Sequence, residues 1–221
     1  MGPRSSAHPV SILTAILIIQ IPVTPIDRIS LAIADGYAEV ISGKHSVNAA
    51  GFAIHSEIHE AHPWINAVCH AHSTAGKAYS AFGKPLPSLT QDSLKFHGKH
   101  SILYEYHGPV LSTKEGKAIA RVINDRTNVV ILKNHGPLSV GTTIDEACYW
   151  FICFDRCCQS QLMIDAATPA RGEPATIDEE VAREAADTIG TRSRGFSSFP
   201  AVLSEHDSTD RRFFPTLEVL Y

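Results

Sequence analysis

Histidine is the residue type in this sequence whose number and spacing could do chemistry. The chain has 221 residues, of which 12 are histidines, and imidazole is the commonest metal ligand and an acid or base near neutral pH. His70 and His72 are two residues apart in a predicted strand over residues 67–72, so the strand period places both rings on one face. A third ligand could come from His135, in a glycine-containing turn after the aliphatic segment Val129–Leu132. Three histidines and one open position match a catalytic zinc site.

A second group of histidines competes with this one. His55, His59 and His62 are spaced by four and three residues, which places them on one face of a predicted helix. Such a face could bind a metal ion, but it is more typical of a helix side that is exposed to solvent or to a partner. A His-x-His pair in a strand can likewise be ordinary surface polarity. Spacing alone therefore leaves both groups open as metal sites.

The elements that must position these histidines alternate between strands and helices. Ser112 and Glu115 form a capping box at the start of one predicted helix, and Thr143 and Glu146 form another at the start of the longest helix. Thr176 is expected to cap a later, acidic helix. This alternation is typical of an α/β protein layered around a central sheet. The predicted strands cover residues 29–34, 37–41, 67–72, 101–104, 129–132 and 138–140, and the predicted helices cover residues 48–62, 73–83, 112–125, 143–167 and 176–189.

Composition excludes several classes of protein. A formal net charge of −4, from 23 acidic and 19 basic residues, leaves no excess of Lys and Arg to hold a phosphate backbone, so nucleic acid is not an expected partner. The 5 cysteines lack disulfide-framework or zinc-ribbon spacing, which favours free thiols in a reducing, cytoplasmic compartment. The apolar run over residues 10–21 is shorter than the roughly 20 residues that span a bilayer, so no membrane segment is expected. We interpret this run as a strand or an N-terminal extension.

Three motifs in a fixed order carry a family resemblance. A helix motif is followed by a His-Ala-His strand motif and then by an Asn-His-Gly turn motif, with Ser139-Val140-Gly141 and Asp145-Glu146-Ala147 behind them. Together they resemble the class II aldolase/adducin family, over roughly residues 29–190. The three motifs read GFAIHSEIH over residues 51–59, AVCHAHS over residues 67–73 and VILKNHG over residues 130–136.

The resemblance implies a fold, an assembly and a ligand set. The family fold is a three-layer α/β/α sandwich around a central, mostly antiparallel sheet, and its members commonly form tetramers. In the family's aldolases the positions that match His70, His72 and His135 bind zinc, so the resemblance selects the strand group over the helix group. We divide the chain into a divergent N-terminal extension over residues 1–28, the family domain over residues 29–194 and a C-terminal tail over residues 195–221.

Two departures from the family pattern leave the activity open. In the family's sugar-phosphate aldolases, a glutamate upstream of the first metal histidine acts as the base, and ungapped counting places Gly51 at that position here. Glu57 is the candidate replacement for this base. Residues 1–28 also look unlike the N-terminal elements of the family.

These observations predict a homo-oligomer that binds zinc or another divalent metal. Its expected chemistry is that of a carbon–carbon lyase, or a related enediolate enzyme, acting on a small hydroxy-carbonyl substrate. One alternative is a non-catalytic adducin-like domain that binds the actin cytoskeleton. Another is a truncated family member without activity. Whether the chain is an enzyme stays open at this point.

Overall fold

A five-stranded sheet forms the centre of the fold. The computed structural model describes residues 13–16, 30–34, 37–42, 49–106 and 113–209. In spatial order the strands of the sheet are β1 (Leu13–Ile16), β4 (Ala67–His70), β7 (Gly136–Gly141), β6 (Val129–Leu132) and β5 (His100–Leu103).

The sheet is mixed in strand direction. The expected antiparallel pairing holds in its centre, where β7 is antiparallel to both β4 and β6. At the two edges, β1 is parallel to β4 and β5 is parallel to β6. Parallel neighbours need a crossover connection, and a helix lies between β5 and β6 in the chain. Of the two central antiparallel pairs, only β6–β7 joins consecutive strands, and a crossover through α3 adds β5 at one edge.

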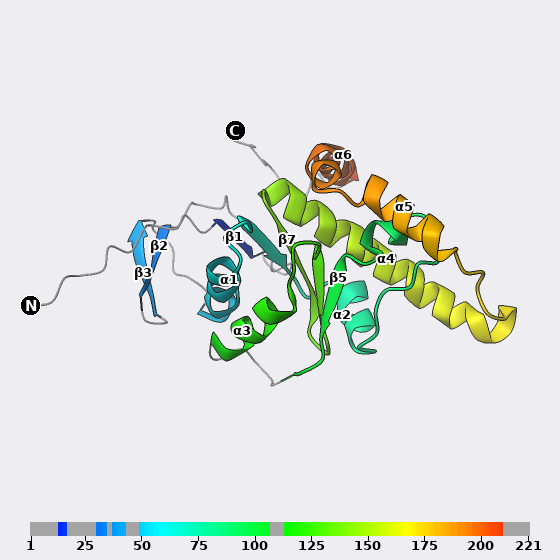
Figure 1. Cartoon of the computed structure of the whole chain (residues 1–221), viewed down its shortest axis with the longest axis horizontal. Coiled ribbons are helices and arrows are strands. Elements are labelled where there is room, and N and C mark those ends of the chain that lie inside the picture. The colour runs from blue at the N-terminus through cyan, green and yellow to red at the C-terminus, as the bar shows by residue number, and fades with distance from the viewer. Residues whose placement is uncertain (1–12, 17–29, 35–36, 43–48, 107–112, 210–221) are drawn as a thin grey trace, which may run out of the picture.

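Six helices and one short 3-10 segment accompany the sheet in the described part of the chain. Figure 1 shows α1 and α3 on one side of the sheet and α2 and α4 on the other side. α6 packs against α4, and α5 packs against the 3-10 segment η1. The bounds are α1 Ala49–Ala61, α2 Thr74–Ser80, η1 Ser93–Phe96, α3 Thr113–Val122, α4 Ile144–Arg171, α5 Glu179–Ile189 and α6 Arg192–Thr209.

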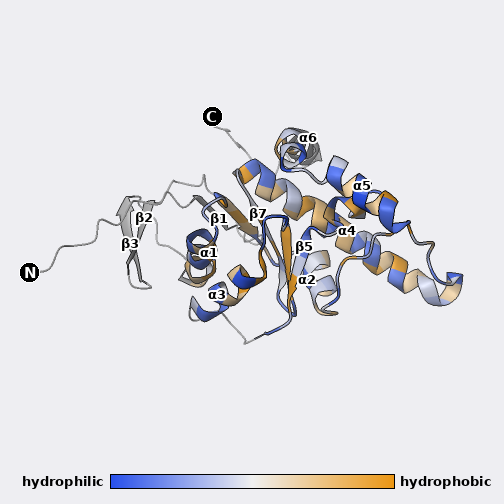
Figure 2. Cartoon of the chain, in the orientation of Figure 1, coloured by the Kyte–Doolittle hydropathy of each residue, from blue (hydrophilic) through white to orange (hydrophobic). Residues whose placement is uncertain are grey.

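Strand β6 shows how the layers are held together. All four of its residues are buried, and alternate side chains point to opposite faces of the sheet. Val130 and Leu132 belong to an apolar cluster with residues of α1 and α3. Val129 and Ile131 belong to a second cluster with Trp150 and other residues of α4. The sheet is thus covered on both faces, in agreement with the predicted three-layer arrangement, and Figure 2 shows its central strands in the colour of hydrophobic residues.

Two predictions about the C-terminal part are wrong. The acidic helix α5 begins at Glu179, later than predicted, because Asp178 rather than Thr176 caps it by accepting from the backbone N–H groups of residues 180 and 181. Residues after 195 were expected to form a polar tail, but α6 covers Arg192–Thr209. The composition of this segment does not indicate a helix, since it contains Pro200 and few apolar residues. Packing against α4 explains the difference, because Phe199 joins the apolar cluster around Trp150.

The N-terminal part contains the two strands predicted over residues 29–34 and 37–41 and one further strand. β2 (Ser30–Ala34) pairs antiparallel with β3 (Tyr37–Ser42), and residues 35–36 between them lie outside the described residues. β1 falls within the apolar run over residues 10–21, which supports its interpretation as a strand. The division of the chain at residues 28/29 and 194/195 stays a prediction.

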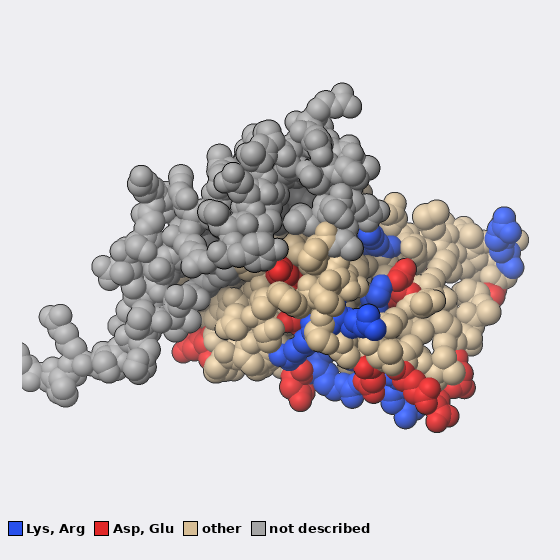
Figure 3. Space-filling view, turned by 90° about the horizontal axis from the view of Figure 1, so that it is seen from above, with Lys and Arg blue, Asp and Glu red and all other residues tan. Residues whose placement is uncertain are grey.

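The cysteines and the surface agree with the expectations from composition. All five cysteines are free, and Cys69, Cys157 and Cys158 are buried. On the face drawn in Figure 3, basic and acidic side chains are interspersed, so this face presents no large area of one sign. Within the described residues, no helix is long and apolar enough to cross a membrane.

Candidate metal centre

His70, His72 and His135 meet at the end of the central sheet. One ring nitrogen from each lies within 4.8 Å of the other two, and the ring centroids are 4.8 to 5.2 Å apart. Among the described residues, no other group of three or more His, Cys, Asp or Glu side chains converges in this way. β4 ends at His70, so the prediction of a strand through His72 is wrong by two residues. The two histidines nevertheless reach one point, as their spacing indicated.

The turn between β6 and β7 aims His135 back at the other two histidines. Asn134 has a φ of 60° and Gly136 has a φ of 153°. Asparagine tolerates the left-handed region, and a residue with the φ of Gly136 is strained unless it is glycine. A Cβ atom at Gly136 would lie 3.3 Å from the carbonyl oxygen of Ala71 and 3.8 Å from Cε1 of His70. Gly136 therefore allows the turn to lie close to the backbone of Ala71, between His70 and His72.

The partners of the Nδ1 atoms identify the nitrogen atoms that are available to a metal. Nδ1 of His70 lies 2.9 Å from the carbonyl oxygen of Pro137. A carbonyl oxygen can only accept, so Nδ1 carries the proton and donates it, which leaves Nε2 of His70 as an acceptor. Nδ1 of His135 faces the carboxylate of Glu115, with 3.6 Å between Nδ1 and Oε1. Metal-bound histidines usually hold their second nitrogen against a carbonyl or carboxylate in this way.

Burial keeps these rings neutral, which is the form that binds a metal. Burial lowers the pKa of His70 to about 4, with a further lowering from the neighbouring His135 and His72 rings. Burial lowers the pKa of His135 to about 4 as well, helped by His72. The three-histidine donor set, with lowered pKa values at His70 and His135, therefore fits a divalent ion. His72 is the exposed member of the group, so the site opens to solvent on its side.

The helix group of histidines is arranged differently. His59 donates from Nδ1 to the carbonyl oxygen of Ile65 at 2.9 Å, and Nε2 of His62 lies 2.8 Å from the carbonyl oxygen of Ala120. His55 and His59 are only 2% and 7% exposed, so the interpretation of this face as solvent-exposed is wrong for both. Burial lowers the pKa of His55 to about 3, with smaller effects from His70 and His59. His59 and His62 are thus bonded to backbone carbonyl groups, and the three described side chains form no converging group with each other.

Two glutamates near the site have different surroundings. Glu57, the predicted base, lies on α1 with its carboxylate 3.9 Å from Nζ of Lys117 on α3. No hydrogen bond or ion pair joins Glu57 to the three histidines within the described residues. Glu115 on α3 is 8% exposed and lies beside His135. It was not predicted as a site residue because it completes a capping-box pattern, and no spacing rule connects it with His135 on another element.

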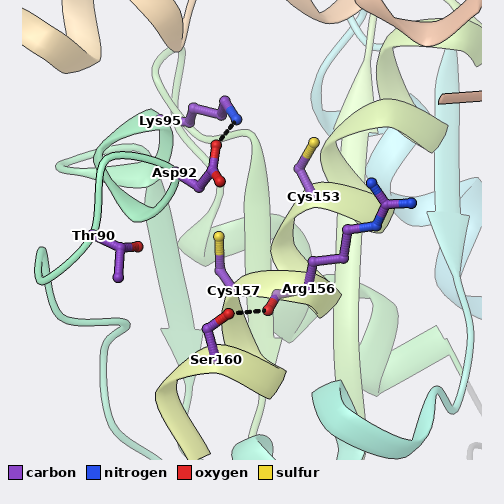
Figure 4. A pocket seen from close by; sticks show the side chains of 7 residues that line it. All are labelled: Thr90, Asp92, Lys95, Cys153, Arg156, Cys157 and Ser160. Carbon is purple, nitrogen blue, oxygen red and sulfur yellow. Dashed lines mark hydrogen bonds and ion pairs between the residues drawn. The ribbon is translucent and has the colours of Figure 1, made fainter. Parts of the chain in front are cut away.

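A cavity of about 260 Å³ lies elsewhere, between the η1 segment and α4. Figure 4 shows Lys95 directed at Asp92 on one wall, and Cys153, Arg156 and Cys157 of α4 on the other. None of the three converging histidines lines it. The metal centre and this cavity are therefore separate features of the described surface.

Comparison with known proteins identifies the family. Residues 21–162 match the model of the class II aldolase and adducin N-terminal domain. The chain therefore belongs to this family, and the resemblance inferred from the three motifs is confirmed.

Two curated relatives come from Streptomyces. The chain is 41% identical to the decarboxylase NovR of Streptomyces niveus, over 80% of this chain and 63% of that protein. It is 40% identical to the 4-hydroxy-3-prenylphenylpyruvate oxygenase/4-hydroxy-3-prenylbenzoate synthase of Streptomyces roseochromogenus subsp. oscitans, over 85% of this chain and 64% of that protein. The chain thus spans slightly less than two thirds of the length of these relatives.

A solved structure and an adducin complete the comparison. The L-fuculose 1-phosphate aldolase of Glaciozyma antarctica PI12 superposes with a TM-score of 0.69 and 36% identity, over 84% of this chain and 70% of that chain. This confirms the predicted fold class. Alpha-adducin of Rattus norvegicus is 35% identical over 47% of this chain, which corresponds to 14% of that protein.

Proposed function

We propose that this chain forms the metal-binding part of an enzyme that breaks a carbon–carbon bond next to a carbonyl group in a small hydroxy-carbonyl or oxo-acid substrate. The observation that carries the proposal is the convergence of His70, His72 and His135, each offering a nitrogen within 4.8 Å of the others. A divalent ion, with zinc as the first candidate, would act there as a Lewis acid that stabilises the electron pair left on carbon.

The protein's own contribution is to present and orient the ligands. His70 is held by its hydrogen bond to Pro137, and His135 is held by the turn at Asn134 and Gly136. Both are placed at the ends of buried strands, so their rings have little freedom to move. His72 is exposed and marks the side from which a substrate would approach.

The names of two relatives, a decarboxylase and an aldolase, support this reaction class without choosing within it. An aldolase and a decarboxylase both break a bond between carbon atoms and leave negative charge beside a carbonyl or carboxyl group. A site with three histidines and open positions serves either reaction, because the ion polarises the oxygen that receives the charge. The substrate is therefore proposed only as a class.

The general base is a separate question. Glu57 stays a sequence prediction, and its carboxylate is engaged with Lys117 at 3.9 Å. Replacing Glu57 by Gln removes the charge and keeps the shape. A base at this position predicts a large loss of kcat with unchanged metal content, whereas an ion-pair role predicts little change in kcat.

Metal analysis of the purified protein tests the proposal. We expect one equivalent of divalent metal in the wild type and in His62→Ala, whose ring bonds to a backbone carbonyl away from the site. We expect its loss in His70→Ala and in His135→Ala. Turnover of aldol and oxo-acid substrates should be lost in the same two variants. Stoichiometric metal in both would remove the proposal.

The remaining expectations are proposals that follow from family membership. Homo-oligomerisation, with a tetramer as the expected state, is tested by light scattering after size exclusion. A cytoplasmic location is tested by fractionation. The adducin-like alternative is favoured by Gly51 at the position of the family base, and co-sedimentation with actin filaments separates it from the enzyme.

A further inference from the structure

We propose that Glu115 is a positioning residue that fixes the ring of His135 for metal binding. The inference rests on the proposed metal function and adds a residue to it. Glu115 holds the proton of His135 on Nδ1, so that Nε2 is the nitrogen offered to the ion. The same role is filled for His70 by the carbonyl oxygen of Pro137.

Geometry and burial carry the inference. Nδ1 of His135 is buried and makes no hydrogen bond within the described part of the chain. The carboxylate Oε1 of Glu115 lies 3.6 Å from it, and the two side chains are 9% and 14% exposed for Glu115 and His135. A buried ring nitrogen rarely stays without a partner. The carboxylate is the group placed to accept from it.

The negative charge of Glu115 would strengthen its contact with His135 when a metal ion is bound. A metal ion on Nε2 draws electron density from the ring and makes the N–H at Nδ1 a stronger donor. A carboxylate then accepts a charge-assisted hydrogen bond, which is shorter and stronger than a neutral one. Glu115 also places one negative charge beside a site whose three ligands are histidines and supply no negative charge of their own. Second partners of this kind change metal affinity by about ten- to a hundredfold when they are removed.

Glu115 also lies in the first turn of α3, where a carboxylate stabilises the helix. A purely helical role predicts a loss of stability without a change in metal affinity. Two substitutions separate these roles. Glu115→Gln keeps an acceptor and remains compatible with a capping box, whereas Glu115→Ala removes both the acceptor and the charge.

The experiment measures zinc affinity by competition with a chromophoric chelator. Glu115→Ala is expected to bind zinc about ten- to a hundredfold more weakly than the wild type, and Glu115→Gln is expected to lie between the two. Glu57→Gln is the matched control, because Glu57 is a carboxylate at the same α1/α3 contact but pairs with Lys117. Its zinc affinity should stay within about twofold of the wild-type value.

A second readout is the position of the proton on the His135 ring, which does not depend on zinc. Nitrogen-15 NMR of the metal-free protein should show the proton of His135 on Nδ1, and Glu115→Ala should shift it toward Nε2. A proton on Nε2 in the wild type overturns the inference, as does wild-type zinc affinity in Glu115→Ala or an equal loss in Glu57→Gln. Wild-type affinity in His135→Ala would instead remove the proposed metal function itself.

Discussion

Replacing Gly116 by alanine tests how closely α1 and α3 are packed around the site. A Cβ atom at Gly116 would lie 2.2 Å from the carbonyl oxygen of Ala53 and 3.0 Å from Cβ and Cγ of Glu57. Since carbon and oxygen approach to about 3.3 Å at the closest, the two helices must separate by roughly 1 Å. In an uncrowded helix the same change would stabilise the protein by about 1 kcal/mol. A loss of stability in Gly116→Ala would therefore indicate the close contact, and a gain would indicate its absence.

The expected change in the free energy of unfolding is the cost of overpacking minus the gain in helix propensity. Overpacking a buried contact costs typically about 1–3 kcal/mol, and subtracting the helix gain of about 1 kcal/mol leaves a net loss of up to about 2 kcal/mol for Gly116→Ala. For a chain of this length that corresponds to a fall in Tm of up to about 8 °C. Urea unfolding followed by circular dichroism measures the free energy, and calorimetry measures the Tm.

A double variant identifies the group that resists the new methyl group. Glu57→Ala removes the contact with Cγ at 3.0 Å, but it leaves Cβ of residue 57, also at 3.0 Å, and the backbone oxygen of Ala53 in place. The pair Gly116→Ala and Glu57→Ala should therefore be no more stable than expected from the two single changes. Full recovery would show that a flexible side chain is the obstacle. A stable single variant would refute the close contact altogether.

Three further predictions concern the site and its supports. Gly136→Ala should cost about 1–3 kcal/mol of stability from backbone strain and should weaken zinc binding. The control is Gly98→Ala, where φ is 64° and nothing lies within 4 Å of the new Cβ atom, so it should cost stability without changing zinc affinity. Equal zinc affinity in the two variants would contradict this. The metal-free protein should lose stability as the pH falls from about 6.5 to about 4, because His70 and His135 take up protons at lower pH when folded than when unfolded. Each contributes a slope of up to about 1.4 kcal/mol per pH unit, measured by urea unfolding across this range, and a flat profile would exclude the lowered pKa values. Thr143→Ala should cost about 1 kcal/mol, because its side chain accepts from the backbone N–H of residue 146 at 3.1 Å, and an unchanged unfolding midpoint would argue against the cap.

Local patterns predicted the part of the fold that holds the ligands. The aliphatic run Val129–Leu132 forms a strand with the predicted bounds. The His-x-His spacing and the Asn-His-Gly turn left His70, His72 and His135 open as one group, and the family resemblance selected this group. The structure brings the three rings together. The long helix α4 also begins where Thr143 predicted it.

Features set by distant contacts could not be predicted in the same way. The helix α6 depends on packing against Trp150, which its own composition does not reveal. His55 and His59 have the spacing of an exposed helix face, yet the rest of the fold buries them. Glu115 meets His135 only because α3 packs beside the end of β6, so sequence spacing carries no signal of this contact. Burial and tertiary neighbours, rather than local pattern, decide all three.

The three ligands belong to two segments of the chain that are distant in sequence, since His135 follows His72 by 63 residues. A bound ion therefore acts as a reversible cross-link between β4 and the β6–β7 turn and closes a long loop through α2, β5 and α3. Because such an ion binds the folded chain and not the unfolded one, its binding free energy adds to the free energy of folding. At a free metal concentration of a hundred times Kd, this gain is about 2.7 kcal/mol. The resistance of this chain to unfolding is thus expected to follow the metal supply of its surroundings.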